Sequence, residues 1–128
     1  MSPYDTPVSA ALRFATEIVA WVAGPWAAAD LADNGWVAIP ALVLLLALPS
    51  VFNARGDKNV TAVAVPGPVR LLIEAVLLAV AVAGAWIVWP VWAAVAATVV
   101  VAAAILTGMA RYRWLAAGAP PVNQGEPS

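Results

Sequence analysis

The amino-acid sequence predicts an all-α membrane protein with four transmembrane helices, arranged as two hairpins with both termini in the cytoplasm. Hydrophobic residues make up 64% of the 128 residues and charged residues 10%, against about 45–50% and about 25% in ordinary globular proteins. Four apolar runs have roughly the length that crosses a bilayer core of about 30 Å. The basic residues group on one side of this scheme, which orients the hairpins.

The first hairpin is expected within residues 10–52. Residues 1–9 form a polar cytoplasmic tail, and Ser9 is placed to cap a helix over residues 10–29. Pro25 lies inside this helix and predicts a kink, because proline removes a backbone donor and clashes with the preceding turn. A polar turn over residues 30–35 leads to the second span, residues 36–52.

The second hairpin follows a polar linker. Residues 53–59 are the most polar stretch and predict a solvated loop, while residues 60–65 predict an extended or interfacial linker. The apolar run over residues 69–109 would be about 60 Å long as one helix, so it must fold back. Trp89-Pro90 places the turn at its midpoint, which gives spans over residues 69–89 and 91–109.

The resulting transmembrane domain covers residues 10–115. Its fourth helix is closed by residues 111–114, which carry two arginines and two aromatic residues. Residues 116–128 are rich in proline and glycine and predict a disordered cytoplasmic tail.

Basic residues and tryptophans both indicate the orientation. All six basic residues fall at the N-terminus, in the central loop or at the C-terminus, and one of the two opposite turns contains Asp30 and Asp33. The positive-inside rule then places both termini in the cytoplasm. Trp114 marks the inner interface, and Trp21 is expected deep against another helix. The other tryptophans gather at the outer helix ends, where indole prefers the headgroup level: Trp26, Trp36, Trp86, Trp89 and Trp92.

An Arg-x-x-x-Glu motif begins the first and third spans, as Arg13 with Glu17 and Arg70 with Glu74. Glycine and tryptophan recur later in both spans, so the two hairpins are interpreted as copies of one parallel repeat. Each glutamate lies one or two turns inside the apolar boundary, where a charge is costly and needs a partner or a water-filled cavity.

The motif admits three interpretations. Arg13 could reach Glu74 and Arg70 could reach Glu17, which would pin the inner ends of the first and third helices together as an ion-pair clasp. The four residues could instead line a polar pocket, open to the cytoplasm, for a headgroup, a solute or a proton. They could also form an interface with another subunit. The clasp is preferred, and it does not exclude the pocket.

The remaining polar residues carry weaker hypotheses. Four basic residues could grip anionic lipid headgroups, although a role as topology determinants is preferred: Arg55, Lys58, Arg111 and Arg113. The hydroxyls of Thr16, Thr98 and Thr107 are expected to bond their own helix backbone.

Composition excludes several classes of function. The chain has no cysteine and no histidine, which removes thiol chemistry, zinc sites of the usual kind and histidine-ligated haem. The net charge of −1 gives no basic field for nucleic acid. Neither a metal site nor a cofactor site is predicted.

The motif residues carry a family resemblance. Leu12-Arg13-Phe14 with Glu17, Gly24 with Trp26, and Gly67-Pro68-Val69-Arg70 with Glu74 resemble the YrdB-like family of small bacterial membrane proteins. The resemblance covers about residues 10–115, and the chain departs from the family pattern at Pro25. It implies four spans and a bacterial inner-membrane setting, and it carries no activity with it.

The sequence therefore favours a non-catalytic integral membrane protein, either an accessory or assembly subunit of a larger membrane complex or a self-associating bundle in contact with membrane lipids. The alternative is a small oligomeric transporter or channel that uses Glu17 and Glu74. An enzyme ranks third, because the two glutamates have no evident second catalytic group beside them.

Overall fold

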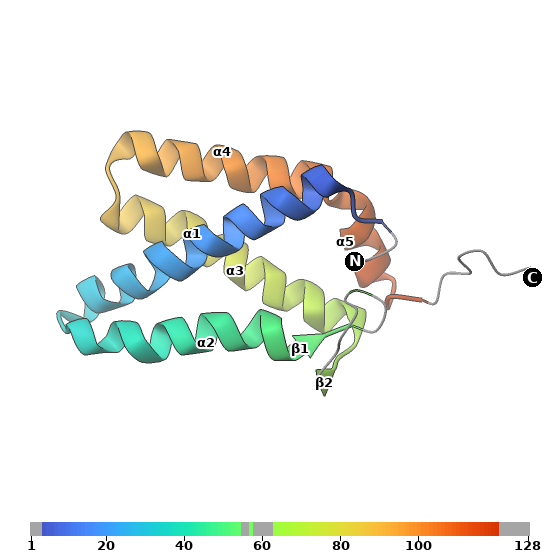
Figure 1. Cartoon of the computed structure of the whole chain (residues 1–128), viewed down its shortest axis with the longest axis horizontal. Coiled ribbons are helices and arrows are strands. Elements are labelled where there is room, and N and C mark those ends of the chain that lie inside the picture. The colour runs from blue at the N-terminus through green and yellow to red at the C-terminus, as the bar shows by residue number, and fades with distance from the viewer. Residues whose placement is uncertain (1–3, 55–56, 58–62, 121–128) are drawn as a thin grey trace, which may run out of the picture.

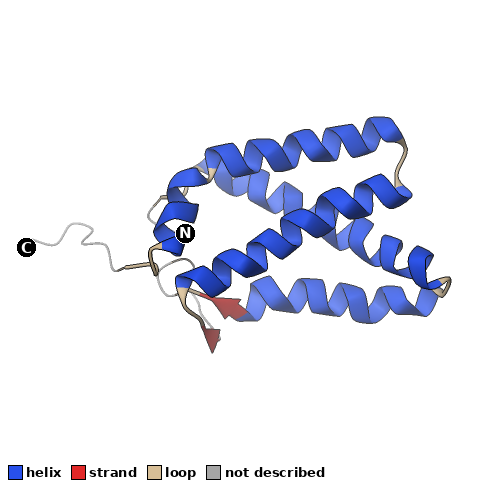
Figure 2. Cartoon of the chain, turned by 180° about the vertical axis from the view of Figure 1, so that it is seen from behind, coloured by secondary structure: helices blue, strands red, loops and turns tan. Residues whose placement is uncertain are grey.

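The computed structural model describes residues 4–54, 57 and 63–120, and these residues form an all-α fold (Figures 1 and 2). Its five α-helices among the described residues are α1 (Pro7–Ala32), α2 (Ala38–Val51), α3 (Gly67–Val88), α4 (Val91–Thr107) and α5 (Met109–Ala116). A 3-10 turn, η1 (Gly35–Val37), precedes α2. Two short strands, β1 (Phe52–Asn53) and β2 (Val63–Ala64), pair in parallel between α2 and α3. The predicted all-α class is confirmed.

Helix α1 begins earlier and ends later than the sequence predicts. Thr6 is the N-cap, and its hydroxyl accepts a hydrogen bond from the Ser9 backbone N–H at 3.1 Å, while the Ser9 hydroxyl accepts one from the Thr6 N–H at 2.9 Å. Ser9 therefore takes part in the cap, but as the third helical residue and not as the predicted N-cap, because the reciprocal capping box satisfies two otherwise unpaired backbone donors at once. The helix continues through Pro25 and ends at Asp33, which is left-handed with φ 50°.

The expected reversal between the third and fourth helices is confirmed. Helix α3 ends at Val88, Trp89 has an extended backbone with φ −100° and ψ 155°, and Pro90 precedes α4. The fourth helix does not continue through residues 111–114, however. It ends at Thr107, and α5 departs from it at an angle of 62° across Gly108.

The described part of the predicted C-terminal tail is ordered by packing. Helix α5 packs against the beginning of α3, and Gly67 lies so close that an added Cβ would stand 2.1 Å from the Leu115 carbonyl oxygen. The Trp114 indole N–H donates to the Pro120 carbonyl at 2.9 Å. Trp114 is buried, which corrects its assignment as an interface marker. Residues 116–120 are thus not a disordered tail, and residues 121–128 lie outside the described part.

Helices α1 and α3 cross at the centre of the molecule, and α2 and α4 flank them (Figure 1). Small side chains line the crossing: Ala20, Ala23, Ala81 and Ala85 are all fully buried. A Cβ on Gly84 would stand 2.9 Å from the backbone carbon and oxygen of Ala23, closer than real contacts allow. The small residues therefore let two helix backbones approach closely, as in helix pairs within membranes.

The distribution of apolar and charged side chains between surface and interior is the opposite of that in a water-soluble domain. Large apolar side chains are exposed along every long helix, including Leu72 at 64%, Val99 at 61% and Leu106 at 75%. Fully buried side chains include the arginines Arg70 and Arg111. A water-soluble fold of this length would place its leucines inside and its arginines in solvent.

By length and composition, α3 is the one helix in the described residues that could cross a membrane by itself. Helices α4 and α5 would count as a second crossing segment if the bent pair formed one span. The apolar segment Gly35–Val51 is shorter, and α1 carries Arg13, Glu17 and Asp30. Only 28% of the most apolar window of α3 is buried within the molecule, which differs from the mostly buried core helix of a soluble protein.

Candidate functional site

Helices α1 and α3 begin at one end of the bundle, where α5 also lies (Figure 1). Charged side chains from four parts of the chain meet there. They come from the start of α1, the segment between the strands, the first turns of α3 and the middle of α5. The group contains three arginines and three carboxylates, and its formal charges cancel. We call it the ion cluster: Asp5, Arg13, Asp57, Arg70, Glu74 and Arg111.

Arg111 lies at the centre of the ion cluster. Its Nε donates to Asp57 Oδ1 at 2.7 Å and its Nη2 donates to Asp57 Oδ2, so the guanidinium holds both carboxylate oxygens. Its Nη1 donates to Glu74 Oε2 at 2.6 Å. Arg111 is 1% exposed, and Asp57 and Glu74 are each 3% exposed. Paired charge-assisted hydrogen bonds of this kind combine strength with a fixed geometry.

Arg70 joins α3 to the end of α2. Its Nη1 lies 3.3 Å from the carbonyl oxygens of both Pro49 and Phe52 and donates to them. These groups belong to the last turn of α2 and its C-cap, where helix carbonyls lack intrahelical partners and a cation is favoured. The Arg70 Nε lies 3.8 Å from Asp57 Oδ2. From the sequence, Arg70 was expected to pair with the carboxylate of Glu17, and this capping role was not predicted.

Arg13 and Asp5 form a bidentate pair at the start of α1. Arg13 Nη1 and Nη2 donate to the two oxygens of Asp5 at 2.9 and 2.7 Å. Burial by itself raises the pKa of Asp5, but hydrogen bonds from Arg13 and Ser9 outweigh it and hold the pKa below its ordinary value of 3.8. Arg13 Nε also lies 3.8 Å from Glu74 Oε1, which links α1 to α3.

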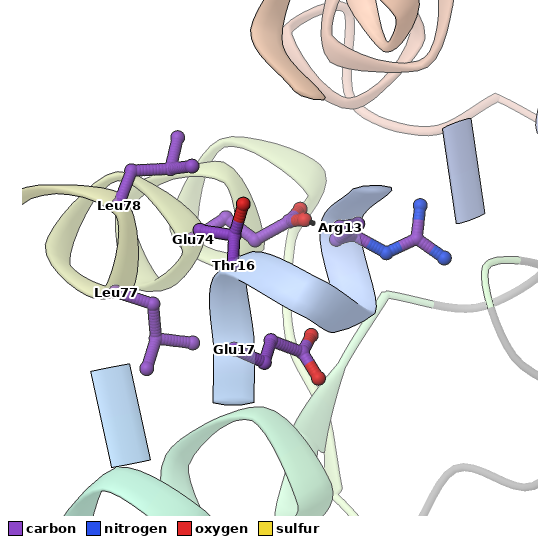
Figure 3. A pocket seen from close by; sticks show the side chains of 6 residues that line it. All are labelled: Arg13, Thr16, Glu17, Glu74, Leu77 and Leu78. Carbon is purple, nitrogen blue, oxygen red and sulfur yellow. Dashed lines mark ion pairs between the residues drawn. The ribbon is translucent and has the colours of Figure 1, made fainter. Parts of the chain in front are cut away.

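The structure brings the four motif residues to the same end of the bundle. The cross-helix pair of Arg13 with Glu74 is present as an ion pair at 3.8 Å. The reciprocal pair of Arg70 with Glu17 takes a different form: Glu17 attracts Arg70 electrostatically, together with Glu74 and Asp57. Arg13, Glu17 and Glu74 also line one small cavity between α1 and α3 (Figure 3).

Two members of the ion cluster, Asp5 and Asp57, were not recognised from the sequence as site residues. Residues 53–59 were interpreted as a solvated loop, but Asn53, Ala54 and Asp57 are buried. The loop prediction was wrong at these positions because Asp57 enters the bundle to meet the arginines. Asp5 was assigned to a polar tail. The available signal was charge matching, since the three arginines of the ion cluster require more carboxylates than the two motif glutamates.

The predicted lipid contacts have different outcomes. Arg111 is buried and saturated by carboxylates, so its assignment to lipid headgroups was wrong. Arg113 is exposed, and its contact with headgroups stays a prediction. Arg55 and Lys58 lie outside the described residues. The three threonines do bond their own helices, through the carbonyls of Leu12, Ala94 and Ala103.

A larger cavity of about 370 Å³ lies between the segment before α3 and the turn after α5. Gly67, Gly118 and small apolar residues line it, and none of its lining residues is ionisable. In the described part of the chain, no group of three or more His, Cys, Asp or Glu residues could hold a metal ion. Among the described residues, the ion cluster is therefore the candidate functional site.

No protein-family model matches this chain, and neither a curated protein nor a solved structure matches it. The resemblance to the YrdB-like family accordingly stays a prediction.

Proposed function

We propose that the chain is a four-helix integral membrane protein without catalytic activity, in which the ion cluster holds the cytoplasmic ends of the helices together. One observation carries this proposal: large apolar side chains face outward while arginines and carboxylates are buried at one end. A bilayer satisfies such a surface, because lipid tails accept exposed leucine and valine and charged groups avoid them.

Helix lengths support four crossings. At 1.5 Å per residue, the 26 residues of α1 extend about 39 Å, the 22 of α3 about 33 Å and the 17 of α4 about 26 Å. The bilayer core is about 30 Å thick. Arg13 and Glu17 lower the hydropathy of α1, but they lie at the ion-cluster end, near one boundary of the core. The segment Gly35–Val51 is the shortest and would cross with local thinning of the bilayer.

The orientation of the proposal follows from charge. Arg13, Arg70, Arg111 and Arg113 all lie toward the ion-cluster end, and the connection between α1 and α2 carries Asp33. The positive-inside rule assigns the ion-cluster end to the cytoplasm. Four tryptophans exposed at the opposite end of the helices favour a headgroup level there: Trp26, Trp36, Trp86 and Trp92.

Cysteine accessibility tests membrane insertion and orientation together. The sequence contains no cysteine, so labelling of a variant with one introduced cysteine reports on that position without background from other thiols. Gly35→Cys lies in open space between α1 and α2, and Ala116→Cys is exposed beside the ion cluster. In right-side-out vesicles, a membrane-impermeant maleimide should label Gly35→Cys directly. It should label Ala116→Cys only after the vesicles are lysed. Labelling of both without lysis, or recovery of the protein in the soluble fraction, would contradict the proposal.

The accessory-subunit part of the proposal rests on the balance of charges within the ion cluster. Three arginines meet three carboxylates, which leaves a stabilising role rather than a reacting group. The mass of the intact particle in mild detergent, with proteomics on the same sample, tests it. A stoichiometric partner protein would support an accessory subunit, a homo-oligomer would support the self-associating bundle, and a monomer would contradict both.

A small transporter is the second candidate, and the cavity shared by Glu17 and Glu74 favours it. Glu17→Gln and Glu74→Gln separate the two functions. In a structural cluster, Glu74→Gln lowers the stability in detergent because Arg111 loses a charged partner. In a transporter, solute flux in vesicles falls with both variants while the unfolding midpoint stays near that of the parent protein.

The proposal also includes that the two hairpins are copies of one repeat. Gly24 and Gly84 take equivalent places in the repeat, and both lie where α1 meets α3. A pseudo-twofold axis between α1 and α3 would bring such equivalent glycines together.

A further inference from the structure

A small cavity lies between α1 and α3 beside Glu74 (Figure 3). Its volume is about 10 Å³, at the lower limit of the roughly 10–15 Å³ that one buried water needs. Leu77 and Leu78 line it together with polar residues of both helices: Arg13, Thr16, Glu17 and Glu74.

The Glu74 carboxylate is satisfied on one side only. Its Oε2 accepts from Arg111 at 2.6 Å, whereas its Oε1 is buried and accepts no hydrogen bond from the described residues. Arg13 Nε lies 3.8 Å from Oε1, which is too long for a hydrogen bond. A polar contact beyond about 3.5 Å is commonly bridged by water.

Thr16 supplies a further polar atom. Its hydroxyl hydrogen is used in the bond to the Leu12 carbonyl at 3.0 Å, so Oγ1 keeps lone pairs that can accept. Thr16 is 2% exposed and is enclosed with Glu74 between the two helices. The cavity therefore combines an unpartnered acceptor, a nearby donor and a second acceptor.

We propose that one internal water occupies this cavity and bridges α1 to α3. It accepts from Arg13 Nε and donates to Glu74 Oε1 and to Thr16 Oγ1, and three hydrogen bonds are typical of a buried water. The positive charge of Arg13 on the same wall disfavours a metal cation there. The link between the two central helices is then hydrated at this point rather than a direct ion pair.

Water-edited solid-state NMR of the full chain in lipid bilayers tests this site. The chain has three glutamates, Glu17, Glu74 and Glu126, so carboxyl-labelled glutamate gives three signals, and Glu74→Gln assigns one of them. We expect magnetisation from water to reach the Glu74 carboxyl carbon at short mixing times. A build-up as slow as that of buried leucine methyls would overturn the proposal.

Matched threonine variants separate the internal water from bulk water. Thr16→Val keeps the shape and removes the acceptor, so the early Glu74 signal should be lost. Thr107→Val removes the same kind of backbone bond on an exposed face, to Ala103 at 2.8 Å, and should leave the signal intact. Equal signals in the two variants would contradict the assignment.

Two further substitutions cover the case in which Thr16→Val does not fold. Thr16→Ser retains the acceptor and should keep the early Glu74 signal. Leu78→Phe fills the cavity without removing a polar group and should abolish it. Retention of the signal in Leu78→Phe would show that the water reaches Glu74 by another route.

Discussion

Replacement of Arg111 by methionine tests the ion cluster most directly. The substitution keeps an apolar stem in the buried position and removes the guanidinium that contacts Asp57 and Glu74. Two carboxylates, each 3% exposed, then lose their main partner. Breaking a buried pair in this way costs about 3–5 kcal/mol, a large share of the roughly 5–15 kcal/mol that stabilises a typical domain.

The free energy of unfolding can be measured in mixed micelles by titration with a denaturing detergent, with tryptophan fluorescence as the readout. Arg113→Met is the matched control, because Arg113 lies on the same helix and is exposed. We expect Arg111→Met to lower the free energy of unfolding by about 3–5 kcal/mol and the control to leave it unchanged within error. Equal effects of the two substitutions would refute the reasoning.

A rescue experiment distinguishes the stability lost through unpaired carboxylates from the stability lost through poorer packing. In the Arg111→Met background, Asp57→Asn and Glu74→Gln remove the two charges that were left unpaired. Buried ion pairs can be replaced by neutral groups at little net cost, so the triple variant should regain at least half of the lost stability. A triple variant less stable than Arg111→Met would show that the guanidinium acts mainly through its shape.

Three further outcomes follow from other contacts. Gly84→Leu forces a side chain against the backbone of α1 and should destabilise by at least about 1–3 kcal/mol, while Gly35→Ala, in open space, should not change the unfolding midpoint. Trp21→Phe removes the bond from the indole N–H to the Leu45 carbonyl at 3.2 Å and should cost about 1 kcal/mol. The lowered pKa of Asp5 contributes stability that is present above its ordinary pKa of 3.8 and lost as the pH falls through the folded value; Asp5→Asn should flatten the acid limb of a stability–pH curve.

Local chemistry made the helices predictable. The long apolar runs, the proline after Trp89 and the proline–glycine segment before α3 place the helices and their reversal within a few residues. Trp21 was expected to lie against another helix, and its hydrogen bond to α2 confirms this. These features depend on neighbours in sequence, so the sequence carries them.

The ion cluster could be predicted only in part, because its members lie far apart along the chain. The motif spacing indicated Arg13 and Glu74, but Asp57 and Arg111 are 54 residues apart in sequence, and no periodic pattern connects them. Polarity indicated a solvated loop for Asp57 and a membrane-boundary role for Arg111. Burial was favourable only because each charge met an opposite charge in the folded bundle, which is a property of the tertiary arrangement.

The break at Gly108 was missed for a related reason. Residues 109–116 have helical composition, so a sequence pattern continues α4 into them. The turn of 62° instead directs α5 across the start of α3, where Leu115 is fully buried and packs with Ala54 and Trp114.

The order of the charges along the chain also bears on how the protein is made. The carbonyl groups at the end of α2 receive hydrogen bonds from Arg70, which leaves the ribosome about 20 residues after them. Asp57 and Glu74 in turn receive theirs from Arg111, near the end of the chain. The end of α2 thus lacks these donors until α3 has been made, and the two carboxylates lack Arg111 until α5 has been made. Closure of the ion cluster should therefore follow the synthesis of α5, the helix that supplies Arg111.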